Sequence, residues 1–89
     1  MDKYNIQLSK SVLKDLNFIE KPYLERIKKI INDLLYNPFP ENVKKLKGKD
    51  ELILRIRVGV YRIVYLVDLN KRLIIILGIN HRKSAYKNL

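Results

Sequence analysis

The sequence predicts a single α+β domain in which one strand and a hairpin of two helices precede an antiparallel sheet. Its length of 89 residues suits one domain. Apolar residues recur at helical spacing in the first half, and runs rich in Ile, Val, Leu and Tyr follow in the second. We therefore expect residues 1–89 to form one domain with a twisted antiparallel sheet of three to four strands.

The first segment alternates between apolar and polar residues. Tyr4, Ile6 and Leu8 are separated by Asn5 and Gln7. This alternation is typical of a half-buried strand, because successive side chains point to opposite faces.

Two helical stripes follow, and a proline separates them. Ser9 or Ser11 can cap the first helix, because a hydroxyl accepts a hydrogen bond from a free backbone N–H there. Pro22 disfavours a helical conformation at Lys21, so the first helix ends before it. The same proline suits the first turn of a second helix, and that helix ends at the prolines of residues 38–40. So short a break predicts an antiparallel helix hairpin. The apolar stripes consist of Val12, Leu13, Leu16 and Ile19, and of Leu24, Ile27, Ile30, Ile31, Leu34 and Leu35.

The second half has the composition of a sheet. Residues 43–47 are a short strand or an extended basic loop, and 51–58, 60–67 and 73–80 are strands. The last of these is apolar on both faces, so we expect it to be central and covered by helices on at least one side. Residues 81–87 form a polar tail or one or two helical turns.

Composition limits the chemistry. The chain has no cysteine and one histidine, which excludes a zinc site, and three acidic residues in the second half do not suit a two-metal nuclease. We therefore expect no metal and no cofactor. The N-terminus has no apolar run typical of a secretory signal, and no segment is long enough to span a membrane, so we expect a cytoplasmic protein.

Positive charge is concentrated in the second half. The net charge is +10, and residues 42–89 hold twelve Lys and Arg against three acids, while residues 1–41 hold seven against six. An uneven field of this kind favours a polyanionic partner, either nucleic acid or an acidic protein segment.

The turn at Gly59 brings arginines together. Arg55 and Arg57 share one strand face, and a two-residue turn places Arg62 on that face, whereas a three-residue turn sends it to the other. Arg62 lies in an otherwise apolar strand, so we expect it to be at least half buried. Arg55 and Arg57 are equally well explained as solvated residues or as ligands of an anion. Guanidinium groups suit phosphate because they donate paired hydrogen bonds.

Cleavage of RNA by its own 2′-hydroxyl remains possible with this residue set, because the substrate supplies the nucleophile. The protein must then supply cations for the phosphate and groups that transfer protons. In the tail, His81, Tyr86 and the lysines are candidates for the second task.

Two motifs resemble a known family. Residues 54–65, LRIRVGVYRIVY, are similar to the arginine hairpin and Y-R-[ILV]-[VI]-Y signature of the RelE/ParE toxin superfamily, and residues 81–86 resemble its closing H-R-x-x-x-Y pattern. The resemblance implies a RelE-type toxin, a metal-free endoribonuclease that cleaves mRNA on the ribosome. It assigns Arg62 to the transition-state phosphate, Arg82 to that phosphate or to the leaving oxygen, and Tyr86 to proton transfer as general base or proton relay. Candidate RNA-binding residues are Lys44, Lys45, Lys47, Lys49, Arg55, Arg57, His81, Lys83 and Lys87.

The chain departs from the family at one point. Cleaving members often carry lysines at alternating positions of the first hairpin strand, and Ile53 and Arg55 occupy those positions here. Arginine is a poor proton donor, so these two positions do not support the lysine-based proton step of the family.

The resemblance also implies a partner and leaves two other functions open. The partner is an acidic, RelB-like antitoxin that folds on binding, in a heterodimer or heterotetramer. A ParE-like inhibitor of DNA gyrase and a non-catalytic nucleic-acid-binding module are the alternatives.

Overall fold

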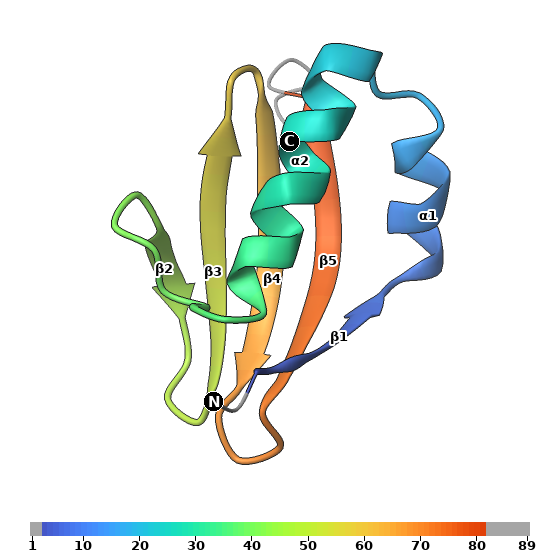
Figure 1. Ribbon diagram of the computed structural model, residues 1–89. Coiled ribbons are helices and arrows are strands. Elements are labelled where there is room, and N and C mark those ends of the chain that lie inside the picture. The colour runs from blue at the N-terminus through green and yellow to red at the C-terminus, as the bar shows by residue number, and fades with distance from the viewer. Residues whose placement is uncertain (1–2, 82–89) are drawn as a thin grey trace.

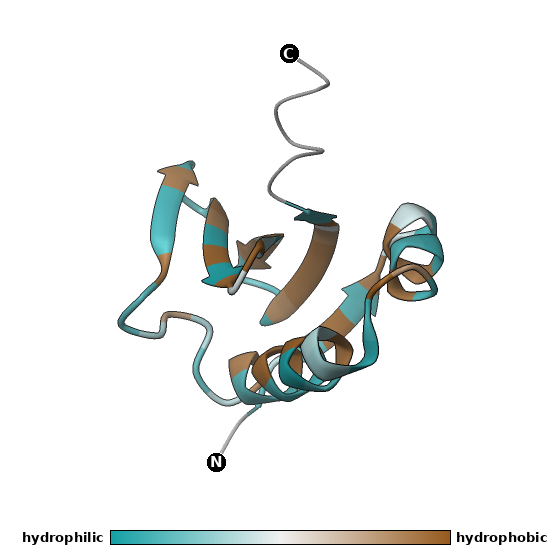
Figure 2. Cartoon of the chain, turned by 90° about the horizontal axis from the view of Figure 1, so that it is seen from above, coloured by the Kyte–Doolittle hydropathy of each residue, from teal (hydrophilic) through white to brown (hydrophobic). Residues whose placement is uncertain are grey.

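A five-stranded sheet with two helices on one face makes up the computed structural model, which describes residues 3–81 (Figure 1). Figure 2 shows α1 and α2 on the same side of the curved sheet. The elements are β1 (Asn5–Leu8), α1 (Lys10–Leu16), α2 (Lys21–Leu34), β2 (Lys44–Lys47), β3 (Glu51–Val58), β4 (Tyr61–Asp68) and β5 (Leu73–His81).

The sheet is larger than predicted, and it is mixed. Its strand order is β1-β5-β4-β3-β2, and β1 pairs in parallel with β5, with Ile6 opposite Ile74. The α+β class is confirmed, and the four strands β2 to β5 pair antiparallel as predicted, but the sheet has five strands because β1 joins it in parallel. Alternation shows that a short strand buries one face without showing which strand it joins. β1 covers the outer edge of β5, so β5 is an interior strand and β4 is the middle one.

Each helix begins where local chemistry permits. Ser9 is the N-cap of α1, and its hydroxyl accepts a hydrogen bond from the Val12 N–H at 3.2 Å. Pro22 lies in the first turn of α2, where a backbone N–H has no partner to lose. The helices run in opposite directions, α1 beside β5 and α2 across the middle of the sheet (Figure 1).

The core lies between the helices and the sheet. Val12, Ile27 and Leu34 from the helices are buried together with alternate residues of β3, β4 and β5. Tyr65 is fully buried in the middle strand, and its hydroxyl donates a hydrogen bond of 2.7 Å to the carbonyl oxygen of Pro38. This bond ties the segment after α2 to the sheet.

We call the sheet face opposite the helices the open face. It carries the strand residues whose side chains alternate with those of the core. In β4, the buried residues Tyr61, Ile63, Tyr65 and Val67 alternate with partly buried residues at 62, 64, 66 and 68. None of the described helices is long and apolar enough to cross a membrane.

Candidate functional site

A two-residue turn joins β3 to β4. Of the two turn lengths considered from the sequence, this is the one that places Arg62 on the same face as Arg55 and Arg57. Val58 lies opposite Tyr61, and Arg57 lies opposite Arg62, so Gly59 and Val60 form the turn. Gly59 adopts φ +60, a conformation that glycine enters at little cost.

The register places the three arginines on the open face. Arg57 and Arg62 are direct partners, and Arg55 pairs with Val64 in the next position along the same face. Arg62 is partly buried, as its apolar strand predicted, while Arg57 is exposed and Arg55 is partly buried. Buried residues such as Ile56 and Ile63 point the other way, toward the helices. The strand geometry thus gathers three guanidinium groups at one end of the open face.

Burial and charge make this end of the sheet suitable for an anion. Two like charges directly opposite each other on a sheet are destabilising, and Arg57 faces Arg62 in this way. The Nε atom of Arg55 is buried and makes no hydrogen bond among the described residues. A phosphate would neutralise the repulsion and accept paired hydrogen bonds from guanidinium groups.

A β-bulge in β2 places the lysines of residues 44–49, which the sequence suggested as one basic group, on different faces of the sheet. Lys44 pairs with Arg55, Lys45 with Leu54 and Lys47 with Ile53, and the register shifts between Lys45 and Lys47. Because paired residues share a face, Lys44 and Lys47 lie on the open face and Lys45 lies on the other. Lys49 follows in the exposed bend before β3. No sequence signal predicted this division, since a bulge depends on how two strands meet.

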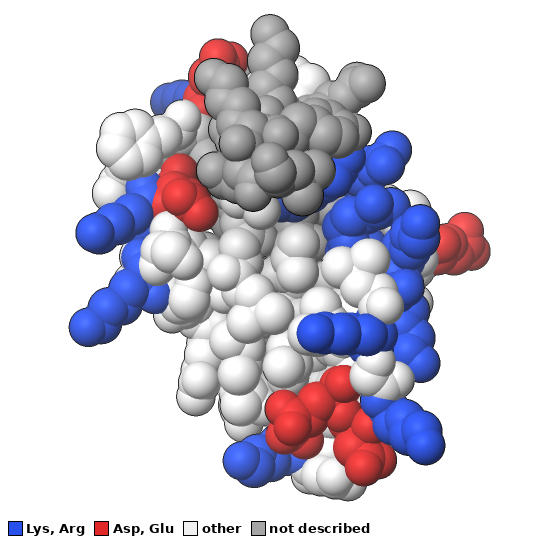
Figure 3. Space-filling view, turned by 180° about the vertical axis from the view of Figure 1, so that it is seen from behind, with Lys and Arg blue, Asp and Glu red and all other residues white. Residues whose placement is uncertain are grey.

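We call Lys44, Lys47, Arg55, Arg57 and Arg62 the cationic cluster. Viewed from behind, Lys and Arg side chains gather along one flank of the open face, beside a white area (Figure 3). Part of that area is an apolar strip formed by Val64, Leu66, Leu73 and Ile75, all partly buried. Acidic residues gather at the lower end in this view, where Glu51 pairs with Asp68. The alternation of the strands alone did not predict the apolar strip as a feature of the site.

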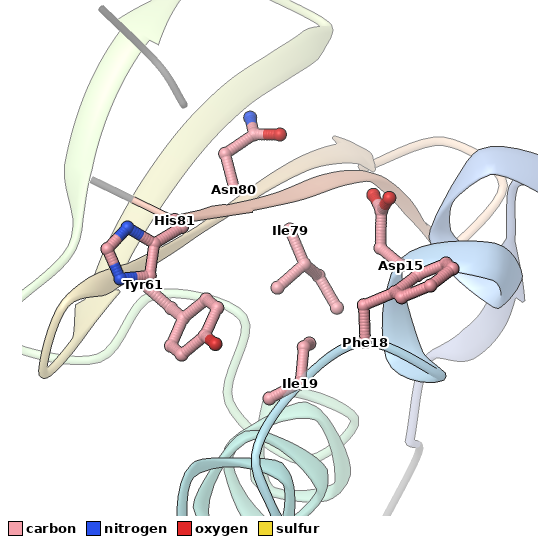
Figure 4. A pocket seen from close by; sticks show the side chains of 7 residues that line it. All are labelled: Asp15, Phe18, Ile19, Tyr61, Ile79, Asn80 and His81. Carbon is pink, nitrogen blue, oxygen red and sulfur yellow. The ribbon is translucent and has the colours of Figure 1, made fainter. Parts of the chain in front are cut away.

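His81 lies on the helix side of the sheet. It pairs with Tyr61 at the end of β5, and the two rings pack edge to face with their centroids 5.2 Å apart. The ring of Tyr61 in turn packs against the ring of Tyr23 in α2, with the two centroids 5.3 Å apart. Figure 4 shows His81 and Tyr61 at one side of a pocket of about 310 Å³, with Phe18 at the other. The remaining lining residues are Asp15, Ile19, Ile79 and Asn80.

The remaining predicted site residues cannot be placed beside Arg62. Arg82, Lys83, Tyr86 and Lys87 lie outside residues 3–81. The structure therefore brings Arg55, Arg57 and Arg62 together with Lys44 and Lys47, and it separates Lys45 and His81 from them by the sheet. Within the described part of the chain, no three acidic or histidine side chains group as a metal site requires.

Comparison with known proteins identifies the family. The family model described as the ParE toxin of the type II toxin–antitoxin system parDE matches residues 6–86. A curated Methanocaldococcus jannaschii protein named as a toxin, RelE1, is 42% identical, and the match covers 97% of this chain and 98% of that protein.

Two solved structures agree with this match. The archaeal RelE–RelB complex from Pyrococcus horikoshii has 32% identity and a TM-score of 0.85, covering 90% of this chain and 96% of that one. The RelB–RelE antitoxin–toxin complex from Methanococcus jannaschii has 32% identity and a TM-score of 0.73, covering 92% and 96%. On the strength of the matched residues, the shared fold and the arginine turn, the chain belongs to the RelE/ParE superfamily of type II toxin–antitoxin toxins.

Proposed function

We propose that the chain is a RelE-type toxin that cleaves mRNA on the ribosome without a metal ion. The observation that carries this proposal is the convergence of Arg55, Arg57 and Arg62 on one face. The RelE names of similar proteins support the same reading. The cationic cluster would hold the RNA backbone, with Lys49 extending it in the bend after β2.

The reaction uses the RNA as its own nucleophile. The 2′-hydroxyl loses a proton and attacks the adjacent phosphorus, the bond to the 5′-oxygen breaks, and that oxygen takes up a proton. The products are a 2′,3′-cyclic phosphate and a 5′-hydroxyl. Negative charge grows on the phosphoryl oxygens during attack, so fixed cations accelerate the step when they bind the transition state more tightly than the substrate.

Arg62 has the best position for this role. It is partly buried within an apolar strand, and a charge interacts more strongly where water is partly excluded. By the family resemblance, Arg82 shares this task and Tyr86 accepts the proton of the 2′-hydroxyl. A phenol needs cationic neighbours to act near neutral pH.

The proposed partner is a RelB-like antitoxin, as in the P. horikoshii and M. jannaschii complexes. An acidic amphipathic segment of that protein fits the open face, where the apolar strip lies beside the cationic cluster. Covering these two surfaces together would block access of mRNA to Arg62.

An assay on translating ribosomes tests the enzyme activity. Arg62→Ala should reduce the cleavage rate by about 100-fold or more, because one electrostatic donor commonly contributes that much. Tyr86→Phe should also reduce it sharply, while Lys28→Ala, on the exposed face of α2, should cleave as the parent protein does. The cleaved ends should be a 2′,3′-cyclic phosphate and a 5′-hydroxyl.

Two results would favour the alternatives. Intact mRNA together with inhibited DNA supercoiling by gyrase would assign the chain to the ParE type. Tight, salt-sensitive RNA binding without any product would identify a binding module that does not catalyse.

A further inference from the structure

The proposed cleavage needs a proton for the departing 5′-oxygen, and the arginines are poor sources of it. A guanidinium group stays protonated at any relevant pH, so Arg55, Arg57 and Arg62 stabilise charge without readily giving up a proton. A lysine is an ammonium ion at neutral pH and can exchange its proton. The donor is therefore better sought among the other groups of the same face.

The register narrows the choice of donor among the described residues. His81 and the tyrosines of β4 lie on the helix side, and the Glu51–Asp68 pair lies at the far end of β3 and β4. Lys44 and Lys47 are the remaining proton-exchanging groups on the cationic side of the open face.

Position along the sheet separates the two lysines. Lys44 lies opposite Arg55, one step of two residues from the Arg57–Arg62 pair, and such a step measures about 7 Å. Lys47 lies opposite Ile53, one further step away, or about 13 Å from the same pair measured along the strand. Because β3 separates β2 from β4, the Cα atom of Arg62 is about 12 Å from that of Lys44 and about 16 Å from that of Lys47. The long side chains of Lys44 and Arg62 can meet at one phosphate over the shorter distance, and position 47 is poorly placed to do so.

Lys44 contributes little to the stability of the fold. It directly opposes Arg55, just as Arg57 directly opposes Arg62, so two like-charged pairs stand next to each other. Like charges across a strand pair are destabilising. Lys44 is also exposed, so it contributes little to the packing of the core.

We propose that Lys44 is the general acid, a role that rests on the proposed mRNA cleavage. As the bond between phosphorus and the 5′-oxygen breaks, Nζ of Lys44 gives its proton to that oxygen. The proton of the 2′-hydroxyl leaves to a separate base, and the neutral amine of Lys44 regains a proton from water. No oxidant, reductant or metal takes part in this step.

A substrate with sulfur in place of the scissile 5′-oxygen tests this role. A thiolate leaves without being protonated, so general acid catalysis becomes unnecessary with this mRNA. Lys44→Gln should slow cleavage of the normal mRNA by about 100-fold or more, the usual contribution of a positioned acid. The same variant should cleave the sulfur-containing mRNA within a few-fold of the parent rate.

Three further variants separate proton transfer from charge. Lys44→Arg keeps the charge and should behave like Lys44→Gln on both substrates. Arg62→Ala should be slow on both, because it removes phosphate stabilisation. Lys71→Gln, an exposed residue of the turn between β4 and β5, should be normal on both and controls for the loss of one positive charge.

The possible outcomes are distinct. Equal losses of Lys44→Gln on the two substrates would make Lys44 an RNA-binding residue and overturn the assignment, as would a normal rate for Lys44→Arg on the oxygen substrate. If the parent protein cleaves neither mRNA on the ribosome, the proposed function itself fails. If it cleaves both and Lys44→Gln does too, only the assignment of Lys44 fails.

Discussion

Gly59 has little room for a side chain. Its φ is +60, and an added Cβ would lie 2.7 Å from Cε1 of Tyr23. Gly59→Ala should therefore lower the free energy of unfolding by about 1–3 kcal/mol, measured by urea denaturation. Gly78→Ala is the matched control, because its Cβ would meet Nδ2 of Asn80 at an ordinary 3.6 Å. Equal losses in the two variants would show that the turn tolerates a side chain.

Tyr65 should make stability depend on alkaline pH. Burial raises the pKa of its phenol, so the unfolded chain releases this proton first, near pH 10. The stabilisation is fully present below that pH and is lost above it, by at most about 1.4 kcal/mol per pH unit.

Tyr65→Phe isolates this contribution. At pH 8 it should cost about 1–2 kcal/mol, because the Pro38 carbonyl loses a buried donor. The gap between parent and variant should narrow between pH 10 and 11 in urea denaturation. A gap that stays constant over this range would contradict a raised pKa.

Helix α1 depends on its first hydroxyl. It has only seven residues, too few for a helix to persist without help, and Ser9 rather than Ser11 is its cap. Ser9→Ala should lower the free energy of unfolding by about 1 kcal/mol. Ser11→Ala, inside the helix, should leave it unchanged or raise it slightly, because alanine is the better helix former. Chemical denaturation of both variants measures the difference. A larger loss at Ser11 would contradict the capping assignment.

Local sequence patterns predicted where the helices and strands lie better than they predicted which strands pair with each other. The alternation around Arg55, Arg57 and Arg62 predicted a shared face because it follows from backbone geometry and turn length. The parallel pairing of β1 with β5 joins residues far apart in sequence, and nothing in the residues 5–8 specifies that partner. The bulge that divides the lysines of β2 likewise arises from contact with β3.

Binding of RNA by the whole molecule should depend on salt through the cationic cluster. Each phosphate contact to a single strand contributes about 0.7 to the slope of log affinity against log salt. Arg57→Gln should reduce that slope by about this amount, and Lys28→Gln, on α2, should leave it unchanged. Fluorescence anisotropy with a short single-stranded RNA at several salt concentrations measures both. Equal slopes for the two variants would exclude Arg57 from the contact surface.

The acidic pair of Glu51 with Asp68 has an effect beyond its own neighbourhood. It lies about 20 Å along the strands from the Arg57–Arg62 pair. Together with Asp50 it offsets the charges of Lys49, Lys71 and Arg72, so this end of β3 and β4 is close to neutral while the Gly59 end is positive. The electric field of a nearby polyanion exerts a torque on this uneven charge distribution, and the torque turns the molecule before the two make contact. The toxin would then arrive with its Gly59 end leading, and fewer collisions would be wasted in the wrong orientation.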